Sequence, residues 1–342
     1  MPRARLTALS LATLTVAALA ACSADTAPAG AEPSAAEDVA ADGAATEYPL
    51  TVDNCGTEVT FESAPERVVT IKSSTAETLL ALGLGDRIVG SAFLDGPVPA
   101  WLADAAEDTA VTDPFSDEVP GTEAVLELDP DLVYAGWESN VAADGAGDRE
   151  TLASLGVNSY VAPAACKAPE YMPNPLTFDE VFAEITEVGA IFDAQDAAAQ
   201  LVAEQQAVLD DVTPDDRDLT ALWYSSGSDI PYVGAGIGAP QMILDAVGVD
   251  NVAGDVEDTW TSMAWEEIVA ADPDVIVLVD ATWNSADDKI DRLESNAATS
   301  ELSAVQAGRY LTVPFPATEA GVRNADAAAD IADQLAELDL DE

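Results

Sequence analysis

The stretch Val68-Val69-Thr70-Ile71-Lys72-Ser73-Ser74-Thr75 decides the fold of this chain. Its first four residues favour a buried strand, and a short polar turn follows before a helical pattern that ends at Gly83 and Gly85. Ser74 and Glu77 have the spacing of a capping box, which predicts where this helix begins. The strand should therefore be followed by a loop that leads into the N-terminus of a helix, as in an α/β protein.

The same alternation of strands and helices continues to the end of the chain. Further strands are predicted at 88–89, 132–135, 160–161, 222–224, 275–279 and 311–313. Further helices are predicted at 122–128, 151–155, 240–247 and 265–270, with an amphipathic helix at the C-terminus. Strands that alternate with helices indicate mainly parallel sheets.

A helical stretch separates the two halves. Thr177 and Glu180 form a second capping box, apolar residues follow at helical spacing, and Asp193 is placed to cap a further helix that runs to about Leu209. We therefore predict two α/β lobes joined by one long helix. The predicted divisions are an N-terminal lobe at 48–176, a helical linker at 177–213 and a C-terminal lobe at 214–342.

The N-terminus has the pattern of an export signal. Two arginines precede an apolar run at 6–19, which is shorter than the roughly 20 residues that cross a bilayer. Leu19-Ala20-Ala21-Cys22 closes the run with small residues before a cysteine. We predict a signal peptide at 1–21 and a lipid on Cys22 that holds the protein on the outer face of the cytoplasmic membrane. The alternative is a signal peptide without lipidation.

Residues 22–47 are predicted to be a disordered tether. They include Ala, Pro, Gly, Thr, Asp and Glu with almost no large apolar side chain, so they cannot bury enough surface to offset the entropy of ordering. The composition changes at Tyr48, and the remaining chain is long enough for two lobes of ordinary size.

Charge and missing residue types exclude several functions. The net charge of −52 argues against a nucleic-acid partner, because both molecules would be polyanions. The chain has no histidine, which excludes a histidine-based catalytic triad, a His-rich zinc site and His-ligated haem. We predict no enzyme activity, no cofactor and no metal site. The excess acid is expected to form a solvated surface, and a specific cation site is the alternative.

Cys55 and Cys166 remain once Cys22 is assigned to lipid. In an exported protein a disulfide between them is favoured over two free thiols. It would close a loop of about 110 residues, which stabilises a fold by roughly 4 to 5 kcal/mol in the chain-entropy model.

Five motifs extend over most of the chain beyond residue 64: Pro65-Glu66-Arg67-Val68-Val69-Thr70-Ile71, Ala81-Leu82-Gly83-Leu84-Gly85-Asp86-Arg87-Ile88-Val89-Gly90, Leu128-Asp129-Pro130-Asp131-Leu132-Val133, Ala271-Asp272-Pro273-Asp274-Val275-Ile276 and Ala304-Val305-Gln306-Ala307-Gly308-Arg309. In their order and spacing they resemble the ferric-siderophore and cobalamin class of ABC solute-binding proteins. The resemblance implies a monomer with a two-lobed periplasmic-binding-protein fold, in which one helix joins the lobes and a small molecule binds in the cleft. It also implies an ABC permease dimer with its ATPase as partner, engaged by one exposed glutamate per lobe, here Glu123 and Glu266.

Four further stretches narrow the resemblance: Asp53-Asn54-Cys55-Gly56, Tyr134-Ala135-Gly136-Trp137-Glu138-Ser139-Asn140, Trp223-Tyr224-Ser225-Ser226-Gly227-Ser228 and Gly234-Ala235-Gly236-Ile237-Gly238-Ala239-Pro240. In these stretches the chain is similar to an actinobacterial group of that class proposed to import the unglutamylated precursor of factor 420, a deazaflavin. The alternatives in the same family are a ferric siderophore, cobalamin or haem.

A planar anionic ligand requires flat apolar walls together with cations or helix N-termini. Trp137, Trp260 and Trp283 follow predicted strands or lie in nearby loops, where ligands of α/β sheets bind; core packing is the alternative. Cations and polar groups predicted to contact the ligand are Lys72, Ser73, Ser74, Lys167, Tyr224 and Arg323. For the three cations, the alternative is a role in salt bridges.

The sequence also contains Gly234-x-Gly236-x-x-Ala239, which fits a loose dinucleotide fingerprint. It supports a less favoured alternative, a secreted Rossmann-type oxidoreductase whose glycine loop holds a pyrophosphate.

Overall fold

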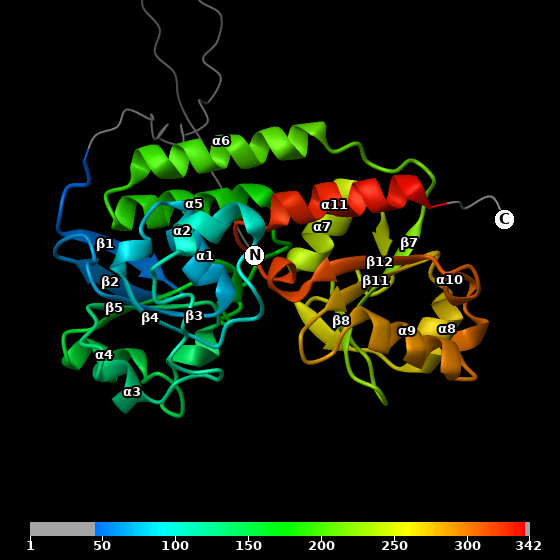
Figure 1. Cartoon of the computed structure of the whole chain (residues 1–342), viewed down its shortest axis with the longest axis horizontal. Coiled ribbons are helices and arrows are strands. Elements are labelled where there is room, and N and C mark those ends of the chain that lie inside the picture. The colour runs from blue at the N-terminus through cyan, green and yellow to red at the C-terminus, as the bar shows by residue number, and fades with distance from the viewer. Residues whose placement is uncertain (1–44, 339–342) are drawn as a thin grey trace, which may run out of the picture. The chain divides into compact units, whose positions relative to one another are not determined.

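The computed structural model describes residues 45–338, which form two α/β lobes (Figure 1). The predicted signal peptide, the predicted lipid site Cys22 and the tether up to residue 44 lie outside the described residues. The folded part begins before the predicted end of the tether at residue 47, because Thr46 is already bound to the protein. Its amide donates to Asp193 Oδ1 at 2.6 Å and its hydroxyl donates to the Ala190 carbonyl at 2.7 Å.

The N-terminal lobe contains a four-stranded parallel sheet in the order β4-β3-β5-β6. These strands are β3 (Val68–Ile71), β4 (Ile88–Ala92), β5 (Leu132–Ala135) and β6 (Asn158–Val161). Its helices are α1 (Ser73–Ala81), α2 (Ala103–Ala106), α3 (Thr122–Leu126) and α4 (Arg149–Ser154). Every residue of β3 and β5 is buried, as expected for a parallel sheet covered on both faces. The predicted strands of this lobe are confirmed.

An antiparallel hairpin that was not predicted precedes this sheet. It consists of β1 (Leu50–Asn54) and β2 (Thr57–Phe61), in which only alternate residues point inward. Its turn contains Cys55 and Gly56, both at positive φ, and Cys55 forms a disulfide with Cys166. The hairpin is thereby tied to the chain that leaves the lobe after β6.

The predicted capping box of α1 is wrong. Lys72 occupies the N-cap position with a φ of 86°, and no side chain of the helix caps it. The amide of Ser73 donates instead to Asp95 Oδ2 at 3.2 Å. Glu77 does not turn back to the helix start, because its carboxylate binds Arg323 of the other lobe.

The predicted linker contains two antiparallel helices, α5 (Phe178–Ile191) and α6 (Gln195–Asp211). The capping box of Thr177 and Glu180 is confirmed, with reciprocal hydrogen bonds of 2.7 and 3.3 Å. Asp193 does not cap α6; it occupies the turn between the helices with a φ of 57°. Helix α6 begins beside the N-terminal lobe and its end packs on the core of the C-terminal lobe, so α6 makes the crossing (Figure 1).

The C-terminal lobe contains a six-stranded sheet in the order β10-β8-β7-β11-β12, with β9 paired to β7. The strands are β7 (Thr220–Ser226), β8 (Tyr232–Gly234), β9 (Asp250–Asn251), β10 (Trp260–Ser262), β11 (Val275–Asp280) and β12 (Tyr310–Pro314). Its helices are α7 (Ala239–Val247), α8 (Trp265–Ala271), α9 (Ala286–Ser295), α10 (Ser303–Gln306) and α11 (Asn324–Glu337). Strands β7, β11 and β12 are parallel as predicted, whereas β8 and β10 are antiparallel and were not predicted.

Side chains from both lobes share one apolar core. Ala239 and Met242 of α7, together with Val322 before α11, pack with the core of the N-terminal lobe. Phe178 at the start of α5 packs against the cores of both lobes. In the described part of the chain, no helix has the length and apolarity required to span a membrane.

Candidate functional site

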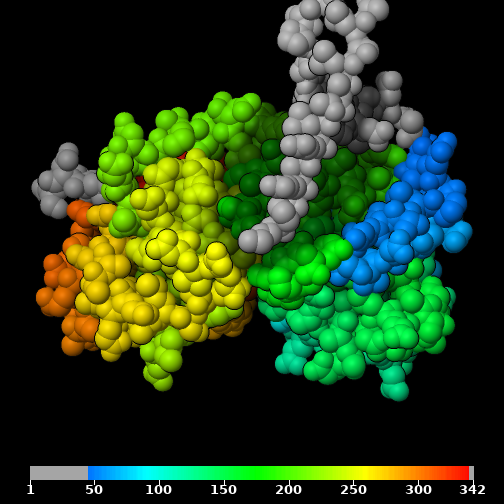
Figure 2. Space-filling view, turned by 180° about the vertical axis from the view of Figure 1, so that it is seen from behind, coloured from blue at the N-terminus to red at the C-terminus, as the bar shows by residue number. Residues whose placement is uncertain are grey.

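A cleft of about 490 Å³ lies between the two lobes. Figure 2 shows the lobes side by side, the N-terminal lobe in blue to green and the C-terminal lobe in yellow to orange. From the N-terminal lobe and the chain that leaves it, the lining residues are Trp137, Glu138, Ser139, Ala164, Ala165, Lys167 and Leu176. From the C-terminal lobe they are Ser225, Ser226, Tyr232, Gly238, Ala239, Asp258, Thr259, Trp260, Trp283, Phe315, Thr318, Glu319 and Ala320.

Trp137 forms the aromatic wall of the N-terminal lobe. It lies two residues after the end of β5, and its amide donates to Asn140 Oδ1 at 3.0 Å, which holds the turn after the strand. The Lys72 ammonium lies 3.7 Å from the centroid of the indole ring, within the range of a cation–π contact. Phe93 packs edge-on against the same ring, with 5.6 Å between the ring centroids. The indole plane is therefore supported from behind.

Two aromatic pairs form the wall of the C-terminal lobe. Tyr232 of β8 and Trp260 of β10 stack with 5.9 Å between ring centroids and 16° between ring planes. The pairing of β8 with β10 explains this, because the two residues are diagonal neighbours on one face of the ladder. Trp283 and Phe315 form an edge-to-face pair with 5.8 Å between ring centroids. The cleft thus has flat apolar surfaces on both lobes.

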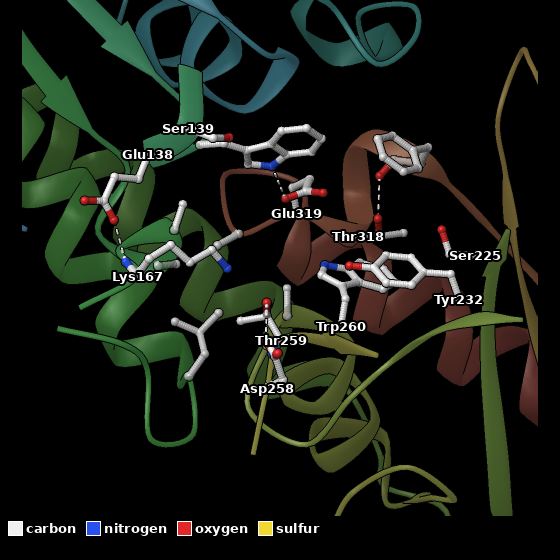
Figure 3. Close-up of a pocket in the computed structure, with 18 of the residues that line it drawn as sticks. Glu138, Ser139, Lys167, Ser225, Tyr232, Asp258, Thr259, Trp260, Thr318 and Glu319 are labelled. Atoms are coloured by element: carbon white, nitrogen blue, oxygen red, sulfur yellow. Dashed lines mark hydrogen bonds between the residues drawn. The ribbon is translucent and has the colours of Figure 1, made fainter. Parts of the chain in front are cut away.

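Lys167 supplies the cleft with an exposed ammonium group, which points into the cavity in Figure 3. Its backbone amide donates to Glu138 Oε2 at 2.6 Å. The preceding residue is the disulfide-bonded Cys166, and Tyr171 further along donates to Asp53 Oδ2 at 2.7 Å. The segment that carries Lys167 is therefore attached to the β1–β2 hairpin at two points.

Three carboxylates also line the cleft, those of Glu138, Asp258 and Glu319. Glu319 differs from the other two because Trp137 Nε1, on the opposite lobe, donates to its Oε2 at 3.0 Å. Burial raises the pKa of Glu319, and the Lys72 ammonium and the Trp137 hydrogen bond oppose that rise. Among the described residues, no group of His, Cys, Asp and Glu side chains could hold a metal ion.

Four predicted ligand-binding residues line the cleft together: Trp137, Lys167, Trp260 and Trp283. The other five do not reach its wall. Lys72 is buried behind Trp137 in an ion pair with Asp95, and Ser73 and Ser74 are buried at the start of α1. Tyr224 is buried and donates to the Gly227 carbonyl at 2.6 Å.

Arg323 also lies away from the lining of the cleft. Its guanidinium donates to both oxygens of Glu77 and to the Pro97 carbonyl. Lys72 and Arg323 therefore act as partners of buried carboxylates, which is the alternative that the sequence had left open.

Several lining residues were not predicted from the sequence, among them Tyr232 and Glu319. Tyr232 lies on a three-residue strand, too short for an alternating pattern to reveal it. Glu319 follows a single 3₁₀ turn at Phe315–Thr318, and nothing nearby in the sequence indicates its contact with Trp137.

The glycine loop before α7 packs against its own chain. A Cβ on Gly236 would lie 2.0 Å from the Gly254 carbonyl oxygen, and a Cβ on Gly234 would lie 2.5 Å from Pro240 Cβ. Close packing thus accounts for these two glycines without a bound dinucleotide. Gly238 and Ala239 at the end of the loop line the cleft.

The two predicted docking residues are exposed, one on each lobe. Glu123 lies in the first turn of α3 and Glu266 in the first turn of α8.

Comparisons with known proteins agree with this architecture. The sequence pattern of the family described as "Periplasmic binding protein" matches residues 68–317. An uncharacterized ABC transporter substrate-binding lipoprotein of Bacillus subtilis, YvrC, is 26% identical over 297 residues, which cover 84% of this chain and 86% of that protein.

Two further relatives are named for their ligands. A cobalamin-binding protein of Halobacterium salinarum is 31% identical over 245 residues, which cover 68% of this chain but only 59% of that protein. The crystal structure of an ABC-type Fe3+-hydroxamate transport system from Saccharomonospora viridis superposes with a TM-score of 0.72 at 27% identity. That match covers 84% of this chain and 99% of the solved one.

Proposed function

The chain belongs to the periplasmic binding protein family, as the solute-binding protein of an ABC importer of the siderophore, cobalamin and haem type, and we propose that its ligand is a deazaflavin, the unglutamylated precursor of factor 420. In this proposal the cleft between the lobes captures the precursor outside the cytoplasmic membrane. The protein then hands it to the permease dimer by way of Glu123 and Glu266. A lipid on Cys22 keeps the protein at the membrane.

One observation carries the proposed ligand: aromatic surfaces on both lobes face a cleft that also contains the Lys167 ammonium. A tricyclic ring could stack on Trp137 or on the Tyr232–Trp260 pair, since both offer flat apolar faces. Lys167 would then bind the phosphate or carboxylate of the side chain. The volume of about 490 Å³ falls within the range of about 300 to 1,000 Å³ found for drug-sized ligands.

Cobalamin is the second candidate, favoured by the name of the Halobacterium salinarum relative. It is larger than the drug-sized molecules for which a cleft of this volume is typical, so it would require the lobes to separate. Both candidates keep the transport role and differ only in the ligand.

A titration followed by tryptophan fluorescence and calorimetry tests the deazaflavin. Stacking contributes about 0.5 to 1.5 kcal/mol beyond burial, and a charge-assisted hydrogen bond about 1.5 to 3 kcal/mol. The precursor should therefore quench the fluorescence, and Lys167→Gln should weaken binding by at least about tenfold. Trp137→Ala should also weaken binding, whereas Trp101→Ala, at an exposed tryptophan outside the cleft, should not.

The same titration with cobalamin, a ferric hydroxamate and haem completes the test. If the wild-type protein shows neither quenching nor heat with high micromolar deazaflavin and retains one of these instead, the deazaflavin proposal is wrong. The family assignment would stand in that case.

A further inference from the structure

Glu319 is a cleft carboxylate that an anionic ligand does not explain. It belongs to the C-terminal lobe, and its Oε2 accepts a hydrogen bond of 3.0 Å from Trp137 Nε1 in the N-terminal lobe, 182 residues away in sequence. A phosphate or carboxylate placed beside it would be repelled. Any contact between Glu319 and the ligand is therefore with a part other than the anion.

The position of Glu319 is set at two points. The Trp137 hydrogen bond holds one carboxylate oxygen, and its own backbone carbonyl accepts a bond of 2.8 Å from the side chain of Asn324. Asn324 is fully buried and also donates to the Ala317 carbonyl at 3.0 Å, so the support is itself held in place. The carboxylate cannot easily turn away from the cleft.

The second carboxylate oxygen, Oε1, is available to a ligand. Within residues 45–338 it has no hydrogen-bond partner, and Figure 3 shows the Glu319 carboxylate directed toward the cavity. Lys167 points into the same cavity from the opposite lobe, and in the described part of the chain no ion pair within 4.0 Å joins the two groups. The space between them is bordered by a hydrogen-bond acceptor on one side and a cation on the other.

We propose that Glu319 Oε1 accepts a hydrogen bond from an N–H on the edge of the ligand's ring, and that the cleft thereby selects rings with an imide or amide N–H. An ionised carboxylate is only an acceptor, so a ring edge with carbonyls alone would leave it unpaired. Sites built to bond a particular N–H or O–H reject analogues that lack it more strongly than apolar pockets reject a missing methylene. The inference rests on the proposed function, because a 5-deazaflavin ring carries such an imide.

The test compares four ligands on two proteins. The ligands are a 5-deazaflavin, riboflavin, and the derivative of each that is methylated at the imide nitrogen. The proteins are wild type and Glu319→Gln, whose side-chain oxygen can still accept from Trp137 while its amide group presents N–H to the ligand. Glu301→Gln, at an exposed position outside the cleft, is the matched control, and thermal unfolding checks that each variant is folded.

In wild type, methylation should weaken binding more than tenfold, because it removes a hydrogen bond to a charged group. In Glu319→Gln the unmethylated ligands should also bind more than tenfold more weakly, and methylation should then have little further effect, as expected for two groups that interact directly. Glu301→Gln should behave as wild type.

Each contrary result has its own meaning. An equal methylation penalty in wild type and Glu319→Gln would overturn the role of Glu319 and leave the deazaflavin proposal intact. Tight, methylation-sensitive binding of riboflavin without binding of the deazaflavin would overturn the proposed ligand and support the role of Glu319. Failure of wild type to bind any of the unmethylated rings would overturn both.

Discussion

Replacing Arg323 with methionine separates a role in joining the lobes from a role in ligand binding. The guanidinium donates to Glu77 Oε2 at 2.6 Å, to Glu77 Oε1 and to the Pro97 carbonyl, and the two side chains are only 10% and 2% exposed. Burial raises the pKa of Glu77, and the bonds and charge of Arg323 oppose that rise. Removing the arginine leaves a buried carboxylate uncompensated, which costs about 3 to 5 kcal/mol in comparable cases.

Urea unfolding of wild type, Arg323→Met and Glu77→Met/Arg323→Met measures this loss. The single variant should lose about 3 to 5 kcal/mol, and the double variant should recover most of it, because buried ion pairs are often replaced by apolar pairs at little cost. The loss should shrink as the pH falls and Glu77 becomes protonated. Because Arg323 does not line the cleft, the dissociation constant of the ligand should change less than about threefold. A loss of stability below about 1 kcal/mol together with a collapse of affinity would refute this reasoning.

Three other changes probe docking, anchoring and one buried lysine. Glu123→Arg with Glu266→Arg should abolish uptake and keep the dissociation constant, since rim charges orient partners; normal uptake would exclude a docking role. Cys22→Ala should release the protein from membranes on fractionation, and unchanged membrane association would exclude the lipid anchor. Lys289 is buried against the Val279 and Asn284 carbonyls, and burial lowers its pKa from 10.5 to about 8. The unfolded chain binds the lysine proton more readily than the folded chain, so the unfolding free energy of wild type, relative to that of Lys289→Met, should rise between about pH 8 and 10.5. A difference between the two proteins that does not change with pH would contradict the lowered pKa of Lys289.

The sequence predicted the parallel parts of the fold because buried parallel strands are continuous apolar runs. Val68–Ile71 and Leu132–Ala135 are buried at every position, so their composition alone identifies them. The hairpin at Leu50–Phe61 was missed although Val52, Val59 and Phe61 are buried and alternate with exposed polar residues, so the sequence did contain a strand pattern there. The short strands β8 and β10 have three residues each, which is too few to show an alternation of buried and exposed side chains.

The aromatic residues of the cleft were easier to predict than its charged ones. Trp137 lies just beyond the end of β5, where the topology of an α/β sheet places ligands, and position along the chain suffices to find it. The role of a cation depends instead on whether the fold brings a carboxylate to it. Asp95 is 23 residues from Lys72, and Glu77 is 246 residues from Arg323. Neither pairing can be predicted from the residues that neighbour these side chains in the sequence.

The contacts that shape the cleft also join its two lobes. Trp137 is held by Lys72 from its own lobe and by Glu319 from the other, so the aromatic wall has its full support only when the lobes are together. The Arg323–Glu77 pair and the shared core around Val322 hold the lobes in that arrangement. Because the shared core remains in Arg323→Met, Trp137 and Glu319 should stay in contact in that variant, and only a change that also disrupts the core should lower affinity. Ligand binding should in turn stabilise the joined lobes, because a ligand that binds only the folded, joined form raises its stability by an amount that grows with the logarithm of the ligand concentration divided by the dissociation constant.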